Sequence, residues 1–254
     1  MEFIDTHAHL YLDNFKDDIQ DVCQRAKQNN ISRIYLPNID TETISQMLAL
    51  ETKFPDLLYP MMGLHPSSVR DNYEKELEKI EEYLQGRTFS AIGETGMDLY
   101  WDQSYKKEQK NAFEKQLNWA KELNLPLVIH SREAFDEIFR IITHNNDNKL
   151  KGIFHSFSGS YEQAEHIINL GFKIGINGIV TFKNSGLADV VKKIDIKHLV
   201  IETDSPFLAP VPKRGKRNES SYIPYIAKKI AEIKNISIED VAKITTINAL
   251  NLFK

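Results

Sequence analysis

Short apolar segments rich in β-branched residues recur along the whole chain, and longer amphipathic segments separate them. Short apolar runs of this kind are typical of strands, whereas a 3.6-residue period is typical of helices. Eight apolar runs are present, covering residues 3–10, 31–39, 57–66, 89–99, 126–131, 151–159, 172–180 and 198–206. The pattern therefore predicts eight strands.

The amphipathic segments predict helices between these strands. The clearest helical spacing falls in residues 104–123, where the apolar positions are Ala112, Phe113, Leu117, Ala120 and Leu123. Segments 160–170 and 220–234 behave similarly, and a last helix is predicted over 237–253. Ser104, Ser160 and Ser237 are candidate N-caps, and Asn124 and Gly171 stand where helices should end.

A strand followed by a helix, repeated eight times without a Pro-, Gly- or Ser-rich linker, indicates a parallel α/β architecture. Eight such units favour a closed (β/α)8 TIM barrel over an open, doubly wound sheet, which remains the alternative. A length of 254 residues suits one barrel domain spanning residues 1–254. No Gly-x-Gly-x-x-Gly motif follows an early strand, which disfavours a dinucleotide-binding fold.

Composition narrows the class of protein further. The formal net charge is −4, so no overall basic field attracts nucleic acid, and an anionic partner must meet a local basic patch or a metal ion. The single cysteine, Cys23, allows no intramolecular disulfide and is expected to be a small buried side chain. No signal peptide or membrane span is recognisable, which predicts a soluble cytoplasmic protein with no membrane partner.

Histidine and acidic residues are concentrated at the ends of the predicted strands. In β/α barrels the chemistry lies at the carboxyl ends of the strands. Five of the eight histidines fall there, together with three carboxylates: His7, His9, His65, Glu94, His130, His155, Glu202 and Asp204. The remaining histidines, His144, His166 and His198, are interpreted as surface or capping residues.

Strand geometry predicts how these side chains converge. Side chains two residues apart share one face of a strand, so His7 and His9 should point together into the barrel mouth, as should Glu202 and Asp204. Strands one and eight are neighbours in a closed barrel, which brings Asp204 to the histidine pair. His130 and His155 come from adjacent strands across the mouth, and Glu94 lies between the two groups.

This arrangement predicts two divalent metal sites. His7, His9 and Asp204 form one, His130 and His155 form the other, and Glu94 bridges them. A mixed imidazole and carboxylate set suits zinc or another transition metal, and zinc, magnesium and manganese are the candidate ions. A lone strand histidine is more often structural than a ligand, but buried polar groups without partners are costly, so eight such residues at matching positions favour metal binding.

Several segments resemble the TatD-type deoxyribonuclease family, a metal-dependent branch of the amidohydrolase-like TIM barrels. They are FIDTHAHL, GLHP, AIGETGMDLYW, LVIHSRE, GIFHSFSG and VIETDSPFLAP with KRGKRNES, and the resemblance extends over residues 3 to about 250. It implies a (β/α)8 barrel and a divalent-metal hydrolase that cleaves phosphodiester bonds in DNA, in some members as a 3′–5′ exonuclease. Single-stranded DNA or 3′ ends are then the expected partner, and no obligatory protein partner is evident.

The family's metal ligands correspond to the residues that the barrel geometry had already selected, namely His7, His9, Glu94, His130, His155 and Asp204. The resemblance adds Glu202 as an acid near the metal and His65 as a histidine on the phosphate side. The chain departs from the family in the loop after strand eight, with Ser220 after Asn218 and Glu219, and with Val211 where an aromatic residue is common.

Roles can be assigned as hypotheses. Metal ions would lower the pKa of bound water, and Glu202 or Asp204 would accept a proton as the general base. His65 would stabilise charge on the phosphoryl oxygens. Arg132 and the loop cations Lys213, Arg214, Lys216 and Arg217 are candidate phosphate contacts, although exposed charges also occur without such a role. Tyr100, Trp101 and Tyr105 could stack on a base or simply cover the barrel.

Two other functions stay open. An amidohydrolase would cleave a small amide or ester with the same binuclear site, although many members bridge their metals with a carboxylated lysine, where this chain offers Glu94. A metal-storing protein would need the ligands but not Glu202, Arg132 and the basic loop beside them.

Overall fold

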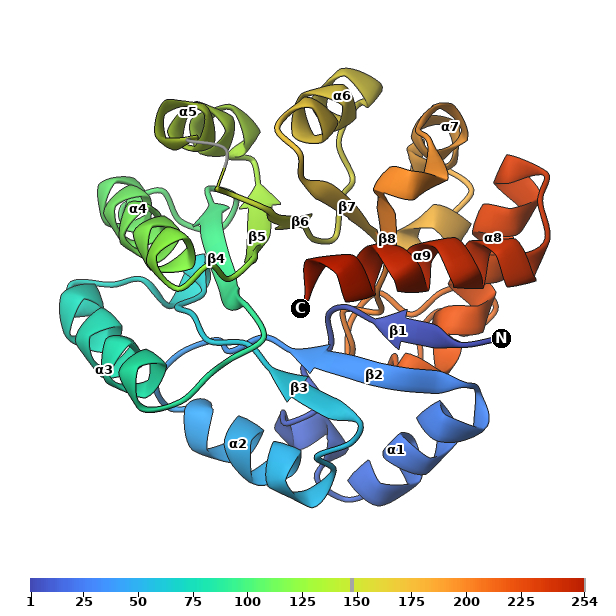
Figure 1. Ribbon diagram of the computed structural model, residues 1–254, viewed down its shortest axis with the longest axis horizontal. Helices are drawn as coiled ribbons and strands as arrows, with labels where there is room; N and C mark the ends of the chain where they lie inside the picture. The colour runs from blue at the N-terminus through green and yellow to red at the C-terminus, as the bar shows by residue number, and fades with distance from the viewer. Residues whose placement is uncertain (147–148, 254) are drawn as a thin grey trace.

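The computed structural model describes residues 1–146 and 149–253 and has the α/β fold predicted from the sequence. Eight strands run parallel to their neighbours in chain order (Figure 1). They are β1 (Phe3–Asp5), β2 (Ile31–Leu36), β3 (Leu58–Pro60), β4 (Ile92–Asp98), β5 (Leu127–Arg132), β6 (Gly152–Phe154), β7 (Lys173–Ile176) and β8 (Leu199–Ile201).

The strands form two sheets, β1–β2–β3 and β4 to β8, and backbone hydrogen bonds connect them at both seams. At the first seam Met62 pairs with Ile92, and the Gly93 amide donates to the Met62 carbonyl at 3.0 Å. At the second, Ala8 pairs with Ser205. These bonds complete the ring of strands that defines a (β/α)8 barrel.

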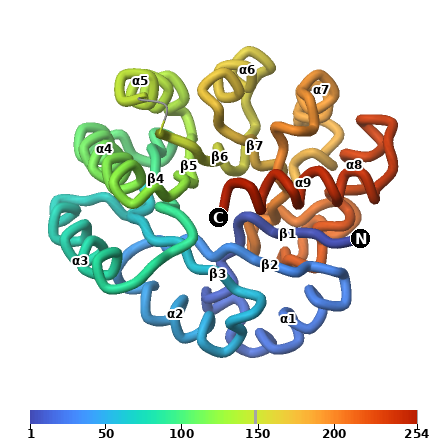
Figure 2. Tube along the Cα trace, in the orientation of Figure 1, coloured from blue at the N-terminus to red at the C-terminus, as the bar shows by residue number. Residues whose placement is uncertain are grey.

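Helices surround the strands on the outside (Figures 1 and 2). They are α1 (Ile19–Gln28), α2 (Ile44–Lys53), α3 (Tyr73–Gly86), α4 (Lys106–Glu122), α5 (Phe135–Asn145), α6 (Tyr161–Asn169), α7 (Leu187–Lys193) and α8 (Ile223–Lys234). A further helix, α9 (Ile238–Leu252), packs against β1 and β8 across one end of the barrel. Short 3₁₀ helices cover Asp13–Phe15, Pro66–Ser68, Gly178–Thr181, Ile196–His198 and Ser220–Tyr222.

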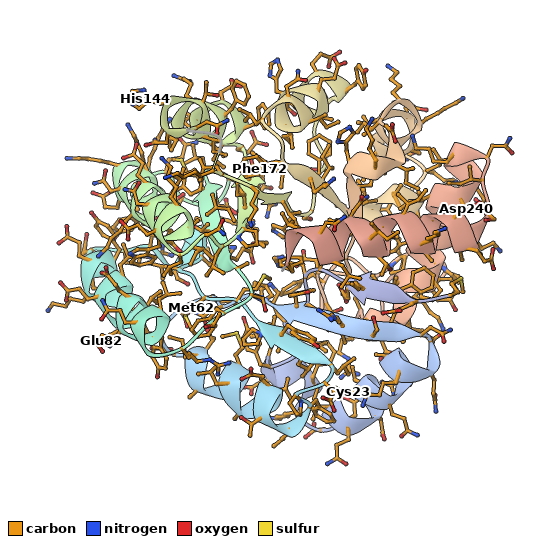
Figure 3. All side chains as sticks on the ribbon, in the orientation of Figure 1. Cys23, Met62, Glu82, His144, Phe172 and Asp240 are labelled. Carbon is orange, nitrogen blue, oxygen red and sulfur yellow. The ribbon has the colours of Figure 1, made fainter. Side chains whose placement is uncertain are left out.

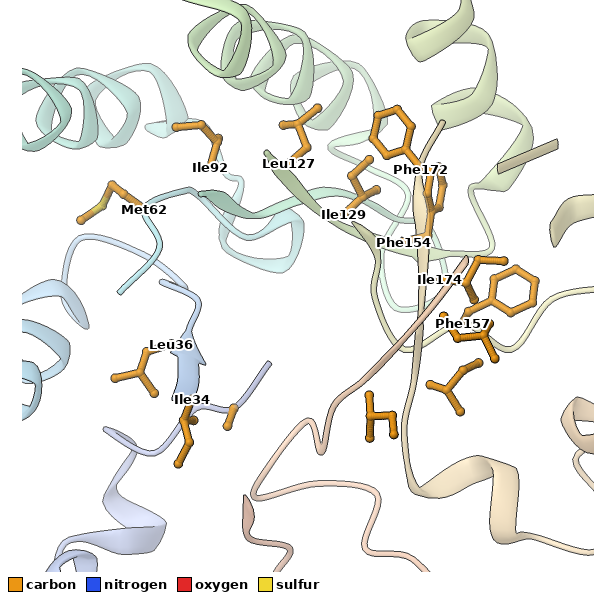
Figure 4. Close-up of a cluster of buried hydrophobic side chains, with 14 of the residues drawn as sticks. Ile34, Leu36, Met62, Ile92, Leu127, Ile129, Phe154, Phe157, Phe172 and Ile174 are labelled. Atoms are coloured by element: carbon orange, nitrogen blue, oxygen red, sulfur yellow. The ribbon is translucent and has the colours of Figure 1, made fainter. Parts of the chain in front are cut away.

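The apolar core has two parts. The larger part lies between the outer faces of the strands and the helices, with Leu127, Phe154 and Phe172 among its members (Figure 4). The smaller part fills the end of the barrel covered by α9, where the Phe253 ring stacks on Tyr35 with centroids 3.9 Å apart. The opposite, carboxyl end of the barrel therefore carries the polar side chains.

Several local predictions are confirmed and others are wrong. Ser160 and Ser237 accept hydrogen bonds as N-caps, and Asn124 and Gly171 adopt the left-handed conformation where their helices end. Ser104 does not cap α4, because that helix begins one residue later, after Tyr105. Most strands are shorter than predicted, since the chain leaves the sheet soon after its buried residues and continues as loops at the barrel mouth.

Two residues outside the barrel mouth, Cys23 and His144, have the burial and the exposure predicted for them. Cys23 on α1 is buried, and burial raises the pKa of its thiol to about 11, so it is an inert core residue (Figure 3). His144 is exposed on α5 (Figure 3). Within residues 1–146 and 149–253, no helix is both long enough and apolar enough to cross a membrane.

Candidate metal centre

Polar side chains from six strands meet at the carboxyl end of the barrel. His7 and His9 follow β1, Glu94 lies on β4, His130 on β5, and His155 directly follows β6. His7, His9, Glu94 and His155 are all at most 5% exposed. This burial is costly for imidazole and carboxylate groups unless they are paired with each other or with an ion.

Glu94 lies between two groups of histidines. Its Oε1 atom is 3.0 Å from His130 Nδ1 and 2.8 Å from His155 Nε2. Its Oε2 atom is 3.1 Å from His7 Nε2 and 3.4 Å from His9 Nε2. The structure thus brings together both predicted groups of ligands, with one oxygen of the predicted bridging carboxylate facing each.

Asp204 approaches the first group from the loop after β8. Its Oδ1 atom is 3.7 Å from His7 Nε2 and 3.8 Å from His9 Nε2. The strand alternation from which we expected Glu202 and Asp204 on one face does not extend to these residues, because β8 ends at Ile201. Instead, Asp204 has a φ of 58° and its amide donates to the His7 carbonyl at 2.8 Å. Loop geometry, which an alternating pattern does not describe, orients this carboxylate.

Glu202 lies behind the donor groups and is fully buried. Its Oε1 atom accepts a hydrogen bond from the Ser156 amide and is 3.6 Å from His155 Nδ1. The carboxylate packs against Gly175, where a Cβ would collide with it. Glu202 therefore lies beside His155, whose Nε2 atom faces Glu94, and it is more deeply buried than Asp204.

His65 was predicted as a phosphate contact, but it lies among the candidate metal ligands. Its Nε2 atom is 3.1 Å from Glu94 Oε1, next to His130. Its Nδ1 atom accepts a hydrogen bond from the Ser67 amide at 3.0 Å, which orients the ring. His65, Glu94 and His130 form one of the clusters whose ligand atoms all lie within 4.8 Å of one another.

Two residues that hold the histidines were not predicted from the sequence. Asp98 Oδ2 is 2.9 Å from His130 Nε2, and the Tyr11 hydroxyl is 3.0 Å from His9 Nδ1. Such partners fix which ring nitrogen is free to bind a metal and how the ring is oriented. The signal in the sequence was their even spacing from predicted ligands, with Asp98 four residues after Glu94 and Tyr11 two residues after His9.

The electrostatics of the centre suit a cation. Burial disfavours the ionised form of Glu94, but attraction by nearby imidazoles, that of His155 first, outweighs burial and holds the pKa of Glu94 well below its usual range. Burial raises the pKa of Asp204 to about 6. Burial also holds the pKa of His7 well below its usual value, so this ring is neutral and able to donate a lone pair.

The residues present fit divalent metal ions. His7 Nε2 and His9 Nε2 lie 3.2 Å apart and converge on Glu94, and a second cluster joins His7, His155 and Asp204 within the same 4.8 Å limit. Neutral imidazoles and carboxylates are the usual ligands of zinc and similar ions. A cavity of about 350 Å³ opens beside His155, lined mainly by residues that follow β5 and β6.

The predicted substrate-binding cations differ in their surroundings. Arg132, at the end of β5, is exposed at the mouth. Arg217 donates from both terminal nitrogens to the two carboxylate oxygens of Asp18, at 2.7 Å each, so its guanidinium is already engaged. The guanidinium of Arg214 lies 4.3 Å from the centre of the Phe182 ring. A surface pocket of about 820 Å³ is lined mainly by basic and aromatic side chains, among them Arg25, Lys213, Lys216, Arg217, Tyr222 and Tyr225.

Known proteins share both the sequence and the fold. A curated relative, an uncharacterized metal-dependent hydrolase YabD of Bacillus subtilis, is 41% identical over 251 residues, which cover 98% of each chain. The crystal structure of YjjV, a TatD homologue from Escherichia coli, superposes with a TM-score of 0.93 at 30% identity and covers 99% of this chain and 97% of that one.

A TatD-family hydrolase from Entamoeba histolytica superposes with a TM-score of 0.87 at 26% identity, covering 100% of this chain and 98% of its own. The family model described as TatD related DNase matches residues 4–254. Curated relatives of this family are metal-dependent hydrolases, in agreement with the donor set at the barrel mouth. The chain therefore belongs to the TatD-related DNase family of metal-dependent hydrolases.

Proposed function

We propose that this hydrolase cleaves phosphodiester bonds of DNA, as a 3′–5′ exonuclease acting on single strands or 3′ ends. The observation that carries the proposal is Glu94, one carboxylate whose two oxygens face two separate histidine groups. Two bridged ions are a common arrangement in enzymes that displace groups at phosphorus. The TatD related DNase model, which matches residues 4–254, supports the choice of DNA.

The first ion would be held by His7, His9, Glu94 and Asp204, and the second by Glu94, His130 and His155, with His65 beside it. Zinc, magnesium and manganese are the candidates. When bound, such ions supply Lewis acidity, which lowers the pKa of water and neutralises charge on phosphoryl oxygens.

Asp204 is the better candidate for the general base. Its side chain is 14% exposed at the mouth, whereas Glu202 is fully buried and bonded to the Ser156 amide. Glu202 then acts by orienting His155, and His65 acts near the phosphoryl oxygens.

Positive charge around the mouth would hold the polyanion. Arg132, Lys213, Arg214 and Lys216 are exposed or partly exposed and available to phosphate groups. Arg217, bonded to Asp18, would act mainly by holding the loop 213–217 in place. Contacts to phosphate weaken as salt concentration rises, which distinguishes this substrate from a small neutral amide or ester.

The test is release of nucleotides from single-stranded DNA labelled at the 3′ or the 5′ end. Wild type is compared with Glu94→Gln and Asp204→Asn in EDTA, Mg²⁺, Mn²⁺ and Zn²⁺. We expect metal-dependent release that begins at the 3′ label and falls at least about a hundredfold in both variants. Asp71→Asn, which changes an exposed carboxylate in the loop after His65, is the matched control and should retain activity.

No release with any metal, from protein that demonstrably holds two ions, would overturn the proposal. The amide or ester substrate of an amidohydrolase would then be the better candidate for the same site. Release that begins at the 5′ label would support the nuclease activity but contradict the proposed 3′–5′ direction.

A further inference from the structure

The most exposed large aromatic side chains lie near the metal centre. Trp101 is 74% exposed, Tyr100 is 54% exposed and Phe207 is 53% exposed. Tyr100 and Trp101 follow β4, and Phe207 follows β8, so all three belong to loops at the carboxyl end of the barrel. Aromatic surface of this extent next to a site indicates a binding role, because solvent exposure of apolar area is unfavourable.

On the β4 side the rings form a cluster with a cation, which we call the aromatic–arginine cluster (Tyr100, Trp101 and Arg132). The Arg132 guanidinium lies 4.0 Å from the centre of the Tyr100 ring and 5.2 Å from that of Trp101. The two rings meet edge to face with centroids 4.9 Å apart. A guanidinium close to aromatic rings presents a charge and a planar group at one place.

The cluster is connected directly to the metal centre. The Tyr100 amide donates to Asp98 Oδ1 at 3.1 Å, and Asp98 Oδ2 contacts His130 Nε2 at 2.9 Å. The Leu99 amide donates to the Arg132 carbonyl at 2.9 Å. A base stacked on this cluster would therefore have a defined position relative to Glu94 and its histidines.

Phe207 occupies the other side of the mouth. Its amide donates to the Asp204 carbonyl at 2.8 Å, and its ring centroid lies 6.4 Å from that of His9. Asn218 Nδ2 donates to the Phe207 carbonyl at 2.6 Å and so fixes the loop. In a ring of eight strands in chain order, the β4–β5 side and the β8–β1 side are opposite each other, with the metal donors between them.

We infer that the mouth binds a single-stranded DNA segment through two stacking positions, one on each side of the phosphodiester that faces Glu94. One base stacks on the aromatic–arginine cluster and the other on Phe207, while Arg132 also meets the backbone charge. This inference rests on the proposed nuclease function. Bases of a duplex are stacked on each other and are not available, so the same surface selects unpaired nucleotides.

Tryptophan fluorescence tests the first position without any metal or turnover. The chain has two tryptophans, and Trp119 on α4 is only 5% exposed, so Trp101 is the one that a ligand can reach. In EDTA we expect an eight-residue oligothymidylate to quench the fluorescence, and the Trp101→Phe variant to lack that change. An abasic oligomer of the same length, which keeps the phosphates but has no bases, should not quench.

Affinity variants test both positions. Trp101→Ala and Phe207→Ala should each raise the Kd for the oligothymidylate about tenfold or more, as expected for loss of one base–aromatic stack. In Phe207→Ala the quenching at saturation should stay as in wild type, because the aromatic–arginine cluster remains intact.

The Arg132→Lys variant keeps the positive charge but loses the planar guanidinium. It should weaken the binding of base-bearing oligomers more than that of abasic ones. Tyr83→Ala, an exposed ring on α3 far from the mouth, is the control.

Equal quenching by base-bearing and abasic oligomers, or none by either, would overturn the stacking position on the cluster. A Phe207→Ala variant that binds as wild type would overturn the second position. These outcomes are separate from failure of the nuclease proposal, which would appear as no nucleotide release by wild type with any metal.

Discussion

At the scale of single residues, most imidazoles of the metal centre have one nitrogen facing Glu94 and the other held by a neighbouring group. The Tyr11 hydroxyl is at His9, the Ser67 amide at His65 and Asp98 at His130. Partners of this kind fix the tautomer and orientation of each ring before a metal binds. Because folding fixes these orientations in advance, metal affinity should depend on residues that are not ligands themselves.

Replacement of Asp98 by asparagine tests this dependence. The Asp98→Asn variant keeps the size of the side chain but removes the charge that orients His130, so its Kd for zinc should rise about 10- to 100-fold. Competition with a chromogenic chelator measures the change. Asp102→Asn, which changes an exposed acid in the loop that follows β4, should bind zinc as wild type does. An unchanged Kd in Asp98→Asn would mean that the barrel alone orients His130.

At the scale of elements, paired charges fasten the loop after β8 to helix α1. Arg25 donates to both carboxylate oxygens of Glu219, at 2.8 and 2.6 Å, and Arg217 does the same to Asp18. Glu219 is 4% exposed, so this pair is shielded from solvent more than a surface pair. The pairs hold the segment that carries the candidate phosphate contacts of the loop 213–217.

Glu219 makes the strength of this connection dependent on pH. Burial raises its pKa, but hydrogen bonding and attraction by Arg25 outweigh burial and leave the pKa of Glu219 lowered from 4.5. A lowered pKa in the folded state adds stability above the ordinary pKa, and this stability is lost as pH falls through the folded value.

The Glu219→Gln variant should therefore lose about 1–2 kcal/mol of unfolding free energy at pH 7, a figure reduced because the Arg25 side chain is partly exposed. The difference from wild type should remain at pH 5.5 and shrink below about pH 4.5. Urea unfolding at pH 7, 5.5 and 4 measures it, with Glu78→Gln on the exposed face of α3 as control. A difference that does not vary with pH would show that packing, and not charge, accounts for the loss.

At the scale of the whole molecule, one end of the barrel is apolar and packed, and the other end carries the candidate metal ligands. One end is filled by apolar side chains under α9, including Ile4, Tyr35, Val128 and Phe253, and the other carries the buried histidines and acids. Close packing at one end supports the rigid strands that position the donors at the other. Stability and metal binding should therefore be separable by mutation.

Phe253→Ala tests that separation. Removal of a ring that is 6% exposed and stacked on Tyr35 should lower the free energy of unfolding by about 3–5 kcal/mol, as expected for a large cavity in a core. The metal content per folded chain should not change. Ile247→Ala, at an exposed position of α9, should cost far less. A loss of bound metal at temperatures where Phe253→Ala remains folded would show that the two ends are coupled.

The alternation of strands and helices, and the set of candidate ligands at the strand ends, could be predicted from the amino-acid sequence. These properties follow from local rules, since burial selects apolar runs and a metal needs particular donor types. His7, His9 and Glu94 could be predicted as candidate ligands in this way because they belong to a strand or directly continue its alternation.

The positions of the carboxylates relative to the histidines, and the groups that hold the histidine rings, follow from the three-dimensional fold. Asp204 and Glu202 lie beyond the end of β8, where loop dihedrals set direction and alternation no longer applies. The hydrogen bonds between Arg217 and Asp18 and the contact of Arg132 with the Tyr100 ring join residues that are far apart in the sequence. Such pairings depend on which segments the closed ring of strands brings together in space. Local patterns of apolar and polar residues carry no information about these neighbours.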